Sequence, residues 1–387
     1  METLVQPQPA TQLQRASAKP FYRPELDVLR FLAFTAVFFH HAFPHAIEPM
    51  LDAGAPWVVA NTASAVLQAG GFGVDLFFVL SAYLITELLI RERELTGRID
   101  IQSFYVRRTL RIWPLYFAFV LLGLVVLPRF APSQRTAPEY AVAFLTFFAN
   151  WAIAFMGSSG SILGPLWSVS IEEQFYCVWP IVVRRATNRA LCASAVGMLL
   201  VASVTRFILC LFHVPHLAVW CNTLARLDPL AMGILLAVWL RGGCAPCRTC
   251  VQRISLLGSV ISLIAAMAVL QPFARRAELA PVLITYPLAA LTCAIIFVNA
   301  LTITGPMLST RAAKTFFYLG KISYGLYVFH LLCITASRKL HGSSVFAQAL
   351  LSFCVTILLA VLSYELFEKP FLRLKQRFSR VESRCRL

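Results

Sequence analysis

Ten or so apolar stretches, each about 20 residues long, follow one another along this chain, the length that a helix needs to cross a bilayer. Inside lipid every backbone polar group must be paired, which only helices and closed barrels achieve. The chain is 59% hydrophobic and 13% charged, whereas a soluble domain carries about a quarter charged residues. We therefore predict an all-α polytopic membrane protein with about ten transmembrane helices. The predicted spans are roughly 26–46, 70–90, 108–128, 162–183, 190–212, 220–240, 254–271, 281–300, 316–338 and 345–367.

The placement of basic residues predicts the orientation of these spans. The net charge is +16, which in a soluble protein would suggest a nucleic-acid partner. With both termini placed in the cytoplasm, 25 of the 34 lysines and arginines fall on the cytoplasmic side and 6 on the outer side. This bias follows the positive-inside rule. It therefore indicates a partnership with the lipid bilayer and none with nucleic acid.

One further apolar stretch, 140–155, does not fit this alternation. Counting it as a span would place the basic residues of 184–189 outside, so we predict a re-entrant or interfacial segment. Residues 1–20 are rich in Gln, Pro, Ala and Thr and are expected to form a disordered cytoplasmic tail. Residues 373–387 are expected to form a basic cytoplasmic tail, which leaves 21–372 as the membrane domain.

The first span carries Arg30 and His41, two ionisable residues that are costly inside a membrane and by default mark function. Eleven helical residues make about three full turns, so both side chains share one face, with a rise of roughly 16 Å between them. Asp27 lies three residues before Arg30 and can pair with it. His40 points about 100° away from His41 and is the weaker catalytic candidate.

The second span begins with a glycine-rich turn that is followed by a carboxylate. Gly71 and Gly73 would permit a close approach between helices. Asp75 lies near the outer end of this span, where it could meet His41 and orient the imidazole. An aspartate stabilised by the helix dipole is the alternative interpretation.

Two later spans add polar groups. Glu172 and Glu173 are adjacent carboxylates in a membrane segment, so at least one needs a partner, a proton or a function. Ser323, Tyr327 and His330 follow the i, i+4, i+7 spacing and form one polar stripe on an apolar helix. We interpret this stripe as a contact surface for substrate.

Three arginines converge at the cytoplasmic end of the third span. Arg107, Arg108 and Arg111 have i, i+3 and i, i+4 spacing. They are either a positive-inside anchor or a site for a polyphosphate ligand, since arginine contacts phosphate with two parallel hydrogen bonds. No Walker A or GxGxxG loop is present to bind a nucleotide by its backbone.

Two remaining groups are interpreted structurally. Cys244, Cys247 and Cys250 have a doubled C-x2-C spacing without an evident fourth ligand, so we predict no metal site. Arg226 and Asp228 in the sixth span are expected to take part in internal ion pairs.

In this order, the motifs resemble the integral-membrane acyltransferase-3 family. The mark of that family is R-x10-H in the first span, here Arg30 and His41, and Ala82 departs from a common glycine. The resemblance covers roughly 21–372 and implies a bacterial inner-membrane enzyme. It implies acyl-CoA, here acetyl-CoA, as the cytoplasmic donor co-substrate, no metal, and a hydroxyl of a carbohydrate-type acceptor. The stretches that carry it are YRPELDVLR, GVDLFFVLSAYLI, FYVRRTLRIWPLY, WSVSIEEQFY and SYGLYVFH.

The resemblance and the residues together predict the site. His41 would act as general base or as an acyl-accepting nucleophile, two mechanisms that the sequence leaves open. A multi-span transporter of a polar solute and a non-catalytic sensor are the alternatives, and a homo-oligomer stays open. An SGNH hydrolase-like domain, which some members carry, is not expected after the last span. We predict catalytic roles for Arg30, His41, Asp75 and Glu173, donor binding by Arg107, Arg108 and Arg111, and acceptor binding by Glu172, Tyr327 and His330.

Overall fold

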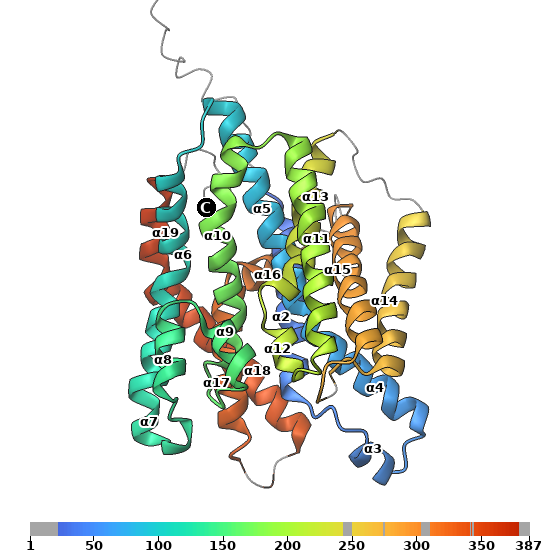
Figure 1. Ribbon diagram of the computed structural model, residues 1–387. Coiled ribbons are helices and arrows are strands. Elements are labelled where there is room, and N and C mark those ends of the chain that lie inside the picture. Colours follow the sequence, from blue (N-terminus) through green and yellow to red (C-terminus); the bar gives the residue numbers. More distant parts are fainter. Residues whose placement is uncertain are drawn as a thin grey trace, which may run out of the picture.

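The chain folds into a bundle of helices (Figure 1). The computed structural model describes residues 22–242, 250–273, 275–302, 310–340, 342 and 344–378. Within these ranges it contains no strand, only one isolated bridge between Pro215 and Arg276. The tail predicted over 1–20, the end of the basic tail, and Cys244 and Cys247 lie outside the described residues.

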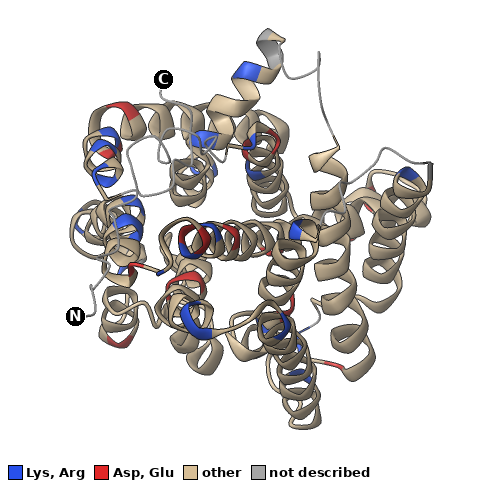
Figure 2. Cartoon of the chain, turned by 90° about the horizontal axis from the view of Figure 1, so that it is seen from above, with Lys and Arg blue, Asp and Glu red and all other residues tan. Residues whose placement is uncertain are grey.

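A helix lies within every predicted span, and the prediction of an all-helical membrane protein is confirmed. Most of the helical surface carries no charge (Figure 2). Six helical segments are long and apolar enough to cross a membrane, or seven if one bent pair counts as a single span, so the number ten stays a prediction. The main helices are α2 (Pro24–Ala42), α5 (Gly73–Thr96), α6 (Ile101–Leu121), α10 (Trp167–Arg185), α11 (Asn188–Leu211), α13 (Leu227–Arg241), α14 (Cys250–Leu270), α15 (Leu279–Leu301), α16 (Arg311–Lys321), α17 (Ser323–Ser337), α18 (Val345–Leu362) and α19 (Lys369–Gln376).

The stretch expected to be re-entrant or interfacial forms two short helices, α8 (Pro138–Leu145) and α9 (Ala149–Met156). Phe147 separates them with a positive φ of 59°. Each helix has 8 residues and rises about 12 Å at 1.5 Å per residue. Neither is long enough to cross a hydrocarbon core of about 30 Å.

Two segments differ from the expected spans. A further helix, α4 (Trp57–Ala69), precedes the second span and continues through a short turn into α5, giving a helical segment of 40 residues. The span predicted over 316–338 is broken instead, because α16 and α17 meet at an angle of 75°. The break at Ile322 lets α16 lie along α2 while α17 enters the bundle.

Glycines set the packing around α2, as predicted for the glycine-rich turn. A Cβ at Gly73 would lie 2.5 Å from the carbonyl oxygen of Ala33, and a Cβ at Gly71 would lie 3.2 Å from Cε1 of His40. A Cβ at Gly320 in α16 would lie only 1.8 Å from the carbonyl oxygen of Asp27. The contacts at Gly73 and Gly320 require glycine, because any side chain would push the helices apart, whereas at Gly71 the His40 ring would have to shift by a few tenths of an ångström.

We expect Gly320→Ala to lower stability by about 1–3 kcal/mol, since overpacking displaces backbone. Thermal unfolding of the purified protein in detergent measures the effect. Gly258→Ala in α14 is the matched control, because no atom lies within 4 Å of a Cβ placed there and alanine favours the helix. Equal melting temperatures for the two variants would contradict the close approach of α16 and α2.

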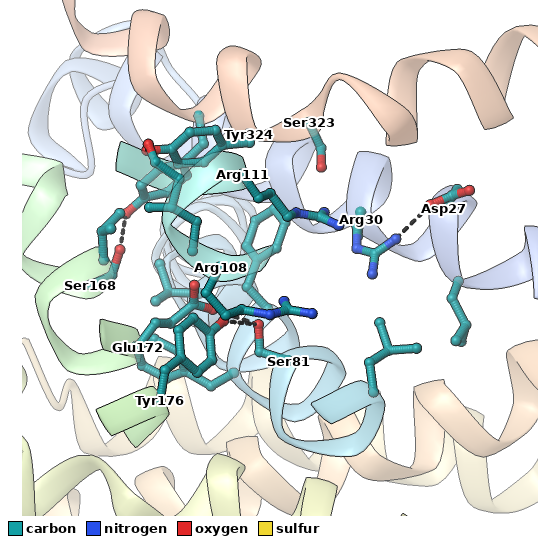
Figure 3. Close-up of a pocket in the computed structure, with 18 of the residues that line it drawn as sticks. Asp27, Arg30, Ser81, Arg108, Arg111, Ser168, Glu172, Tyr176, Ser323 and Tyr324 are labelled. Atoms are coloured by element: carbon teal, nitrogen blue, oxygen red, sulfur yellow. Dashed lines mark hydrogen bonds and ion pairs between the residues drawn. The ribbon is translucent and has the colours of Figure 1, made fainter. Parts of the chain in front are cut away.

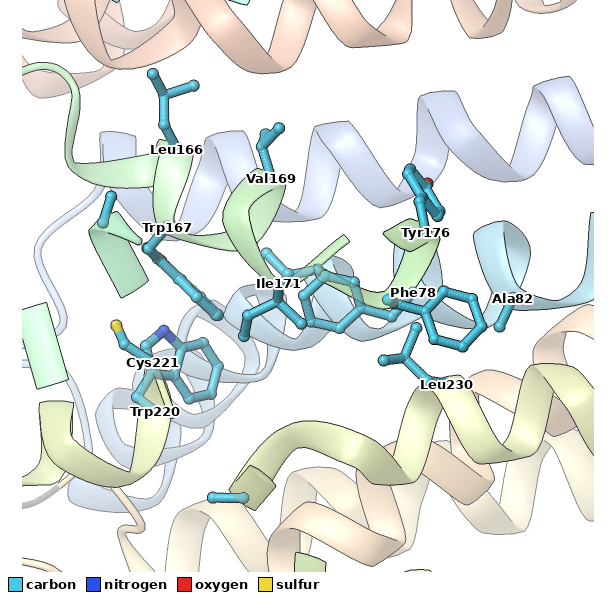
Figure 4. Close-up of a cluster of buried hydrophobic side chains, with 14 of the residues drawn as sticks. Phe78, Ala82, Leu166, Trp167, Val169, Ile171, Tyr176, Trp220, Cys221 and Leu230 are labelled. Carbon is cyan, nitrogen blue, oxygen red and sulfur yellow. The ribbon is translucent and has the colours of Figure 1, made fainter. Parts of the chain in front are cut away.

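The largest buried cluster lies between α5, α10 and α13 (Figure 4). Phe78 of α5, Ile171 of α10 and Leu230 of α13 are buried within it. Trp167 and Trp220 continue the cluster toward one end of the bundle. This aromatic end is also a wall of one of the two cavities described next.

Candidate active site

Two cavities lie along α2, and no residue lines both. The first, here called the arginine cavity, has a volume of about 140 Å³ and is lined by Arg30 of α2 together with Arg108 and Arg111 of α6. Glu172 of α10 lines the same space (Figure 3). The structure therefore brings together two of the three predicted donor-binding arginines and one of the two adjacent carboxylates.

Arg30 is held as the sequence predicts. Its Nη1 donates to Oδ1 of Asp27 at 2.5 Å, and the hydroxyl of Tyr22 donates to the other oxygen of Asp27 at 3.1 Å. The ion pair orients the guanidinium at the edge of the cavity, as Figure 3 shows. The predicted Asp27–Arg30 pair is thus confirmed.

Arg108 lies deeper in the same cavity. Its guanidinium carbon is 5.6 Å from the ring centre of Phe104 and 5.7 Å from that of Tyr176, so aromatic faces support the cation. Its Nε is buried and has no hydrogen-bond partner among the described residues. Ser81 donates to Glu172 at 2.8 Å and contacts the hydroxyl of Tyr176 at 2.9 Å. The cavity therefore combines positive charge with a fixed carboxylate.

Arg107 does not line the arginine cavity, which corrects the predicted cluster of three. Its Nη2 is 3.0 Å from Oε2 of Glu92, and its Nη1 donates to the backbone carbonyl of Phe378 at 2.7 Å. Residues four apart on a helix lie on the same side of it, but this spacing does not fix the direction in which each long side chain points. Here the carboxylate of Glu92 draws Arg107 toward the end of α5, away from Arg111.

The second cavity, here called the histidine chamber, has a volume of about 530 Å³. His40 and His41 from α2, His45 after α2 and His216 from α12 (His216–Trp220) all line it. Burial and the nearby Arg226 lower the pKa of His216 to about 3, so its ring is neutral. Within the described chain, no three metal-ligating side chains are placed to hold an ion.

The hydrogen bonds of His41 determine its tautomer. Nδ1 lies 2.9 Å from the carbonyl oxygen of Val37, which can only accept, so Nδ1 carries the hydrogen. The lone pair is therefore on Nε2, which makes no hydrogen bond within the part of the chain that the structure describes. A neutral imidazole with a free basic nitrogen in a cavity can accept a proton or an acyl group.

His330 completes a histidine pair. Its Nδ1 donates to the carbonyl oxygen of Tyr327 at 2.5 Å, so its Nε2 bears the lone pair, and this atom is 3.4 Å from Nδ1 of His41. His330 is fully buried and lines neither cavity. Its position suits the orientation of His41 better than the predicted contact with an acceptor.

His40 is fixed in a different way. Its Nδ1 is 3.0 Å from the carbonyl oxygen of Leu67 in α4, and its ring stacks on that of His45 with 4.5 Å between ring centres. Both rings face the histidine chamber, but only His41 contacts His330. The geometry thus favours His41 over His40 as the catalytic candidate, and the spacing between His41 and Arg30 favours the same residue.

A hydrogen-bonded septum separates the two cavities, formed by Pro165, Ser168 and Tyr327. The hydroxyl of Tyr327 donates to the carbonyl oxygen of Pro165 at 2.9 Å and is 2.8 Å from Oγ of Ser168. Ser168 and Tyr327 line the arginine cavity, and Pro165 lines the histidine chamber. The hydroxyl of Tyr327 therefore links the linings of the two cavities.

Asp75 does not reach His41, which corrects the predicted contact. Its carboxylate forms a buried ion pair with Arg226. The guanidinium carbon of Arg226 also lies 4.2 Å from the ring centre of Trp220 and 5.1 Å from that of Tyr286. A buried cation needs a counter-ion more than a neutral imidazole does, so the carboxylate pairs with arginine.

Asp228 has a similar partner on another helix. It pairs with Arg206 of α11, whose Nη2 is 3.1 Å from Oδ1 of Asp228. Arg206 also donates to the carbonyl oxygen of Ala225 at 2.8 Å. Arg226 and Asp228 thus both belong to internal ion pairs, as predicted, but not with each other.

Glu173 lines neither cavity, which does not fit its predicted catalytic role. Its Oε2 accepts a hydrogen bond from Nε1 of Trp113 at 3.0 Å, while Oε1 is buried without a partner in the described residues. Adjacent residues on a helix point about 100° apart. Glu172 therefore faces the arginine cavity while Glu173 faces α6.

Sequence reasoning missed several residues of the two cavities. Ser81 and Ser168 stand inside motifs that were recognised, but small hydroxyl residues are common fillers of helix interfaces. His216 and Gln134 lie in short helical turns outside the predicted spans, where no local pattern indicates a site. Only the fold places them beside His41.

The chain is similar in sequence to known acyltransferases. The profile of a family described as "Acyltransferase domain" matches residues 23–365. A putative peptidoglycan O-acetyltransferase, YrhL of Bacillus subtilis, is 29% identical over 363 residues, covering 86% of this chain and 56% of that protein. The peptidoglycan O-acetyltransferase OatA of Listeria monocytogenes is 27% identical over 374 residues, covering 90% and 56%.

A third relative, the O-acetyltransferase OatA of Staphylococcus aureus, is 26% identical over 367 residues, covering 91% of this chain and 57% of its own length. The chain thus spans just over half the length of the curated relatives that it matches. No solved structure gives a significant match.

Proposed function

Because this chain belongs to the acyltransferase-3 family, we propose that it is a membrane O-acetyltransferase that uses acetyl-CoA and a carbohydrate-type acceptor. One observation carries the proposal. The single helix α2 presents Arg30 to a cavity rich in arginine and His41, with a free Nε2, to a separate chamber. A phosphate-bearing donor and a neutral hydroxyl acceptor would need these two environments.

The donor would bind from the arginine cavity, on the proposed cytoplasmic side. Arg108 and Arg111 would contact its phosphates, since guanidinium groups bind phosphate with two parallel hydrogen bonds. Arg30, fixed by Asp27, would bind closer to the thioester. The slender pantetheine arm would then extend past Tyr327 toward His41, which requires the septum to open.

The acceptor would bind in the histidine chamber. Its hydroxyl oxygen attacks the thioester carbonyl carbon, an ester C–O bond forms and the C–S bond breaks. Nε2 of His41 takes the hydroxyl proton and passes it to the departing thiolate of CoA. In the second mechanism, Nε2 first attacks the thioester carbon, the C–S bond breaks and CoA leaves as its thiolate. The acceptor hydroxyl then attacks the acetyl group, the N–C bond breaks, and the hydroxyl proton passes to the thiolate of CoA. His330 holds the His41 ring in either case.

We also propose the finer topology. About ten spans, with 140–155 re-entrant, would keep both termini and the arginine cavity in the cytoplasm of a bacterium. In this orientation 21–372 forms the membrane domain, with Tyr22 and Lys375 near its ends both at the mouth of the arginine cavity. The acceptor would then be a cell-envelope glycan or another glycosylated molecule that reaches the outer chamber.

Inverted membrane vesicles test the proposal. They expose the cytoplasmic face, so labelled acetyl-CoA added outside should label envelope glycans through the wild-type protein. In right-side-out vesicles the same addition should give no label. Solute flux without release of free CoA, in either preparation, would favour the transporter instead.

In the same assay, we expect the double variant Arg108→Ala, Arg111→Ala to raise KM for acetyl-CoA by at least about 100-fold, since it removes two charge-assisted bonds that contribute about 1.5–3 kcal/mol each. Arg98→Ala is the matched control, because Arg98 is an exposed arginine near the same face outside both cavities. An unchanged KM for acetyl-CoA in the double variant would remove the arginine cavity as the donor site.

A further inference from the structure

We infer that the histidine chamber binds an uncharged sugar ring of the acceptor glycan, and that Gln134 and His45 form hydrogen bonds with its hydroxyl groups. The inference rests on the proposed function, because it names the acceptor of the same site. The chamber volume of about 530 Å³ lies within the roughly 300–1,000 Å³ of pockets that enclose small-molecule ligands. An acetyl group alone would leave most of it empty.

Two buried polar atoms in the wall of the chamber lack partners. Oε1 of Gln134 and Nε2 of His45 are buried and make no hydrogen bond within the described residues. A buried polar group without a partner costs about 1–3 kcal/mol, so such pairs of atoms indicate a ligand that supplies the missing bonds. Sugar hydroxyl groups both donate and accept, and so can satisfy either atom.

Two serines add donors to the same wall. Oγ of Ser158 accepts the backbone N–H of Gly160 at 3.2 Å, and Oγ of Ser161 accepts that of Leu163 at 3.3 Å. Each hydroxyl hydrogen can therefore donate to a ligand. Ser158 and Ser161 both line the chamber, in the loop between α9 and α10.

Another part of the lining is aromatic. Trp167 and Trp220 lie side by side, with 5.9 Å between ring centres (Figure 4). Phe273 stands edge-on to Trp220 at 4.9 Å and to His216 at 4.9 Å. The C–H faces of a sugar ring pack on such surfaces by dispersion and burial of apolar area, while its hydroxyl edge faces polar groups. One polar and one aromatic wall match these two sides.

The lining also explains why the ring would be uncharged. None of the described residues that line the chamber is an aspartate, glutamate, lysine or arginine. The cation nearest the aromatic wall, Arg226, lies behind Trp220 and is already paired with Asp75. A sugar carboxylate, sulfate or phosphate would lose its hydration here, and no described side chain of the lining supplies a counter-ion.

The test uses the full-length protein in lipid nanodiscs and two probes of equal length, an N-acetylglucosamine oligosaccharide and an oligosaccharide in which glucuronic acid alternates with N-acetylglucosamine. Quenching of tryptophan fluorescence measures binding, and release of CoA from acetyl-CoA measures turnover separately. We expect the neutral probe to bind at least 10-fold more tightly than the acidic one.

Variants that conserve side-chain shape test whether Gln134 and His45 form hydrogen bonds with the sugar. Gln134→Met and His45→Phe remove the polar atoms and keep the volume, so each should weaken binding of the neutral probe by about 3- to 10-fold, the loss of one hydrogen bond. KM for acetyl-CoA should not change. Gln102→Met, at an exposed glutamine of α6 outside both cavities, should bind the probe as the wild type does.

Equal binding of the two probes, or unchanged binding in both chamber variants, would overturn the inference. Binding as expected but without any release of CoA from the folded protein would overturn the proposed function and leave the sugar site standing. The two failures are therefore distinguishable in one set of samples.

Discussion

Replacing His41 by alanine should reduce acetyl transfer by about 100- to 10,000-fold, the range that a positioned general base contributes. The hydrogen bond of its Nδ1 to Val37 leaves Nε2 as the basic atom in the chamber. Alanine removes that atom, and the neighbouring His330 cannot replace it because its ring lines neither cavity. Transfer of labelled acetyl from acetyl-CoA to glycan, measured in inverted vesicles, gives the rate.

His40→Ala is the comparison for this prediction. His40 is adjacent in sequence and faces the same chamber, but its Nδ1 is used by Leu67 and it does not contact His330. We expect at most about a tenfold loss, mainly through weaker acceptor binding. If His40→Ala lost as much activity as His41→Ala, or if His41→Ala kept its activity, the assignment of the catalytic imidazole would be wrong.

Replacing Asp75 by alanine should destabilise the protein by about 3–5 kcal/mol, the effect of leaving a buried charge without its partner. Arg226 would remain in a cage of aromatic rings, 4.2 Å from the ring centre of Trp220, with no carboxylate. Thermal unfolding in detergent measures the loss. Asp52→Asn is a control, because Asp52 is exposed at the end of a short helix.

The double variant Asp75→Ala, Arg226→Met decides whether this loss comes from the unpaired charge. Removing both charges should recover much of the stability, because apolar replacements of buried ion pairs are often neutral. A double variant as unstable as the sum of its single variants would show that each side chain matters for packing and not for charge balance.

Local contacts of the site follow from the sequence, because helical spacing fixes them. Asp27 and Arg30 are three residues apart on one helix and form the predicted ion pair. Gly71 and Gly73 permit the predicted close approach of the second span to α2. Arg30 and His41 lie on one helix, as predicted, but each lines a different cavity, which the spacing does not predict.

Contacts between distant segments do not follow in this way. Asp75 and Arg226 are 151 positions apart, and a buried carboxylate is compatible with any cation that the fold brings near. Hydropathy registers neither the bend between α16 and α17 nor the packing of Gly320 against Asp27. The helices that carry the charged site, α2 and α10, are among those that fail a simple test of apolar length. In these two helices, the charged residues of the site lower the hydropathy on which span prediction relies.

The septum of Pro165, Ser168 and Tyr327 has an electrical consequence. Moving one elementary charge through a membrane potential of 100 mV is worth about 2.3 kcal/mol. A continuous water-filled channel through such an enzyme would let ions cross the bilayer and would dissipate the membrane potential. In the proposed mechanism, the three hydrogen-bonded residues between the two cavities would instead act as a barrier to ions. Only a neutral thioester on the pantetheine arm would need to cross this barrier.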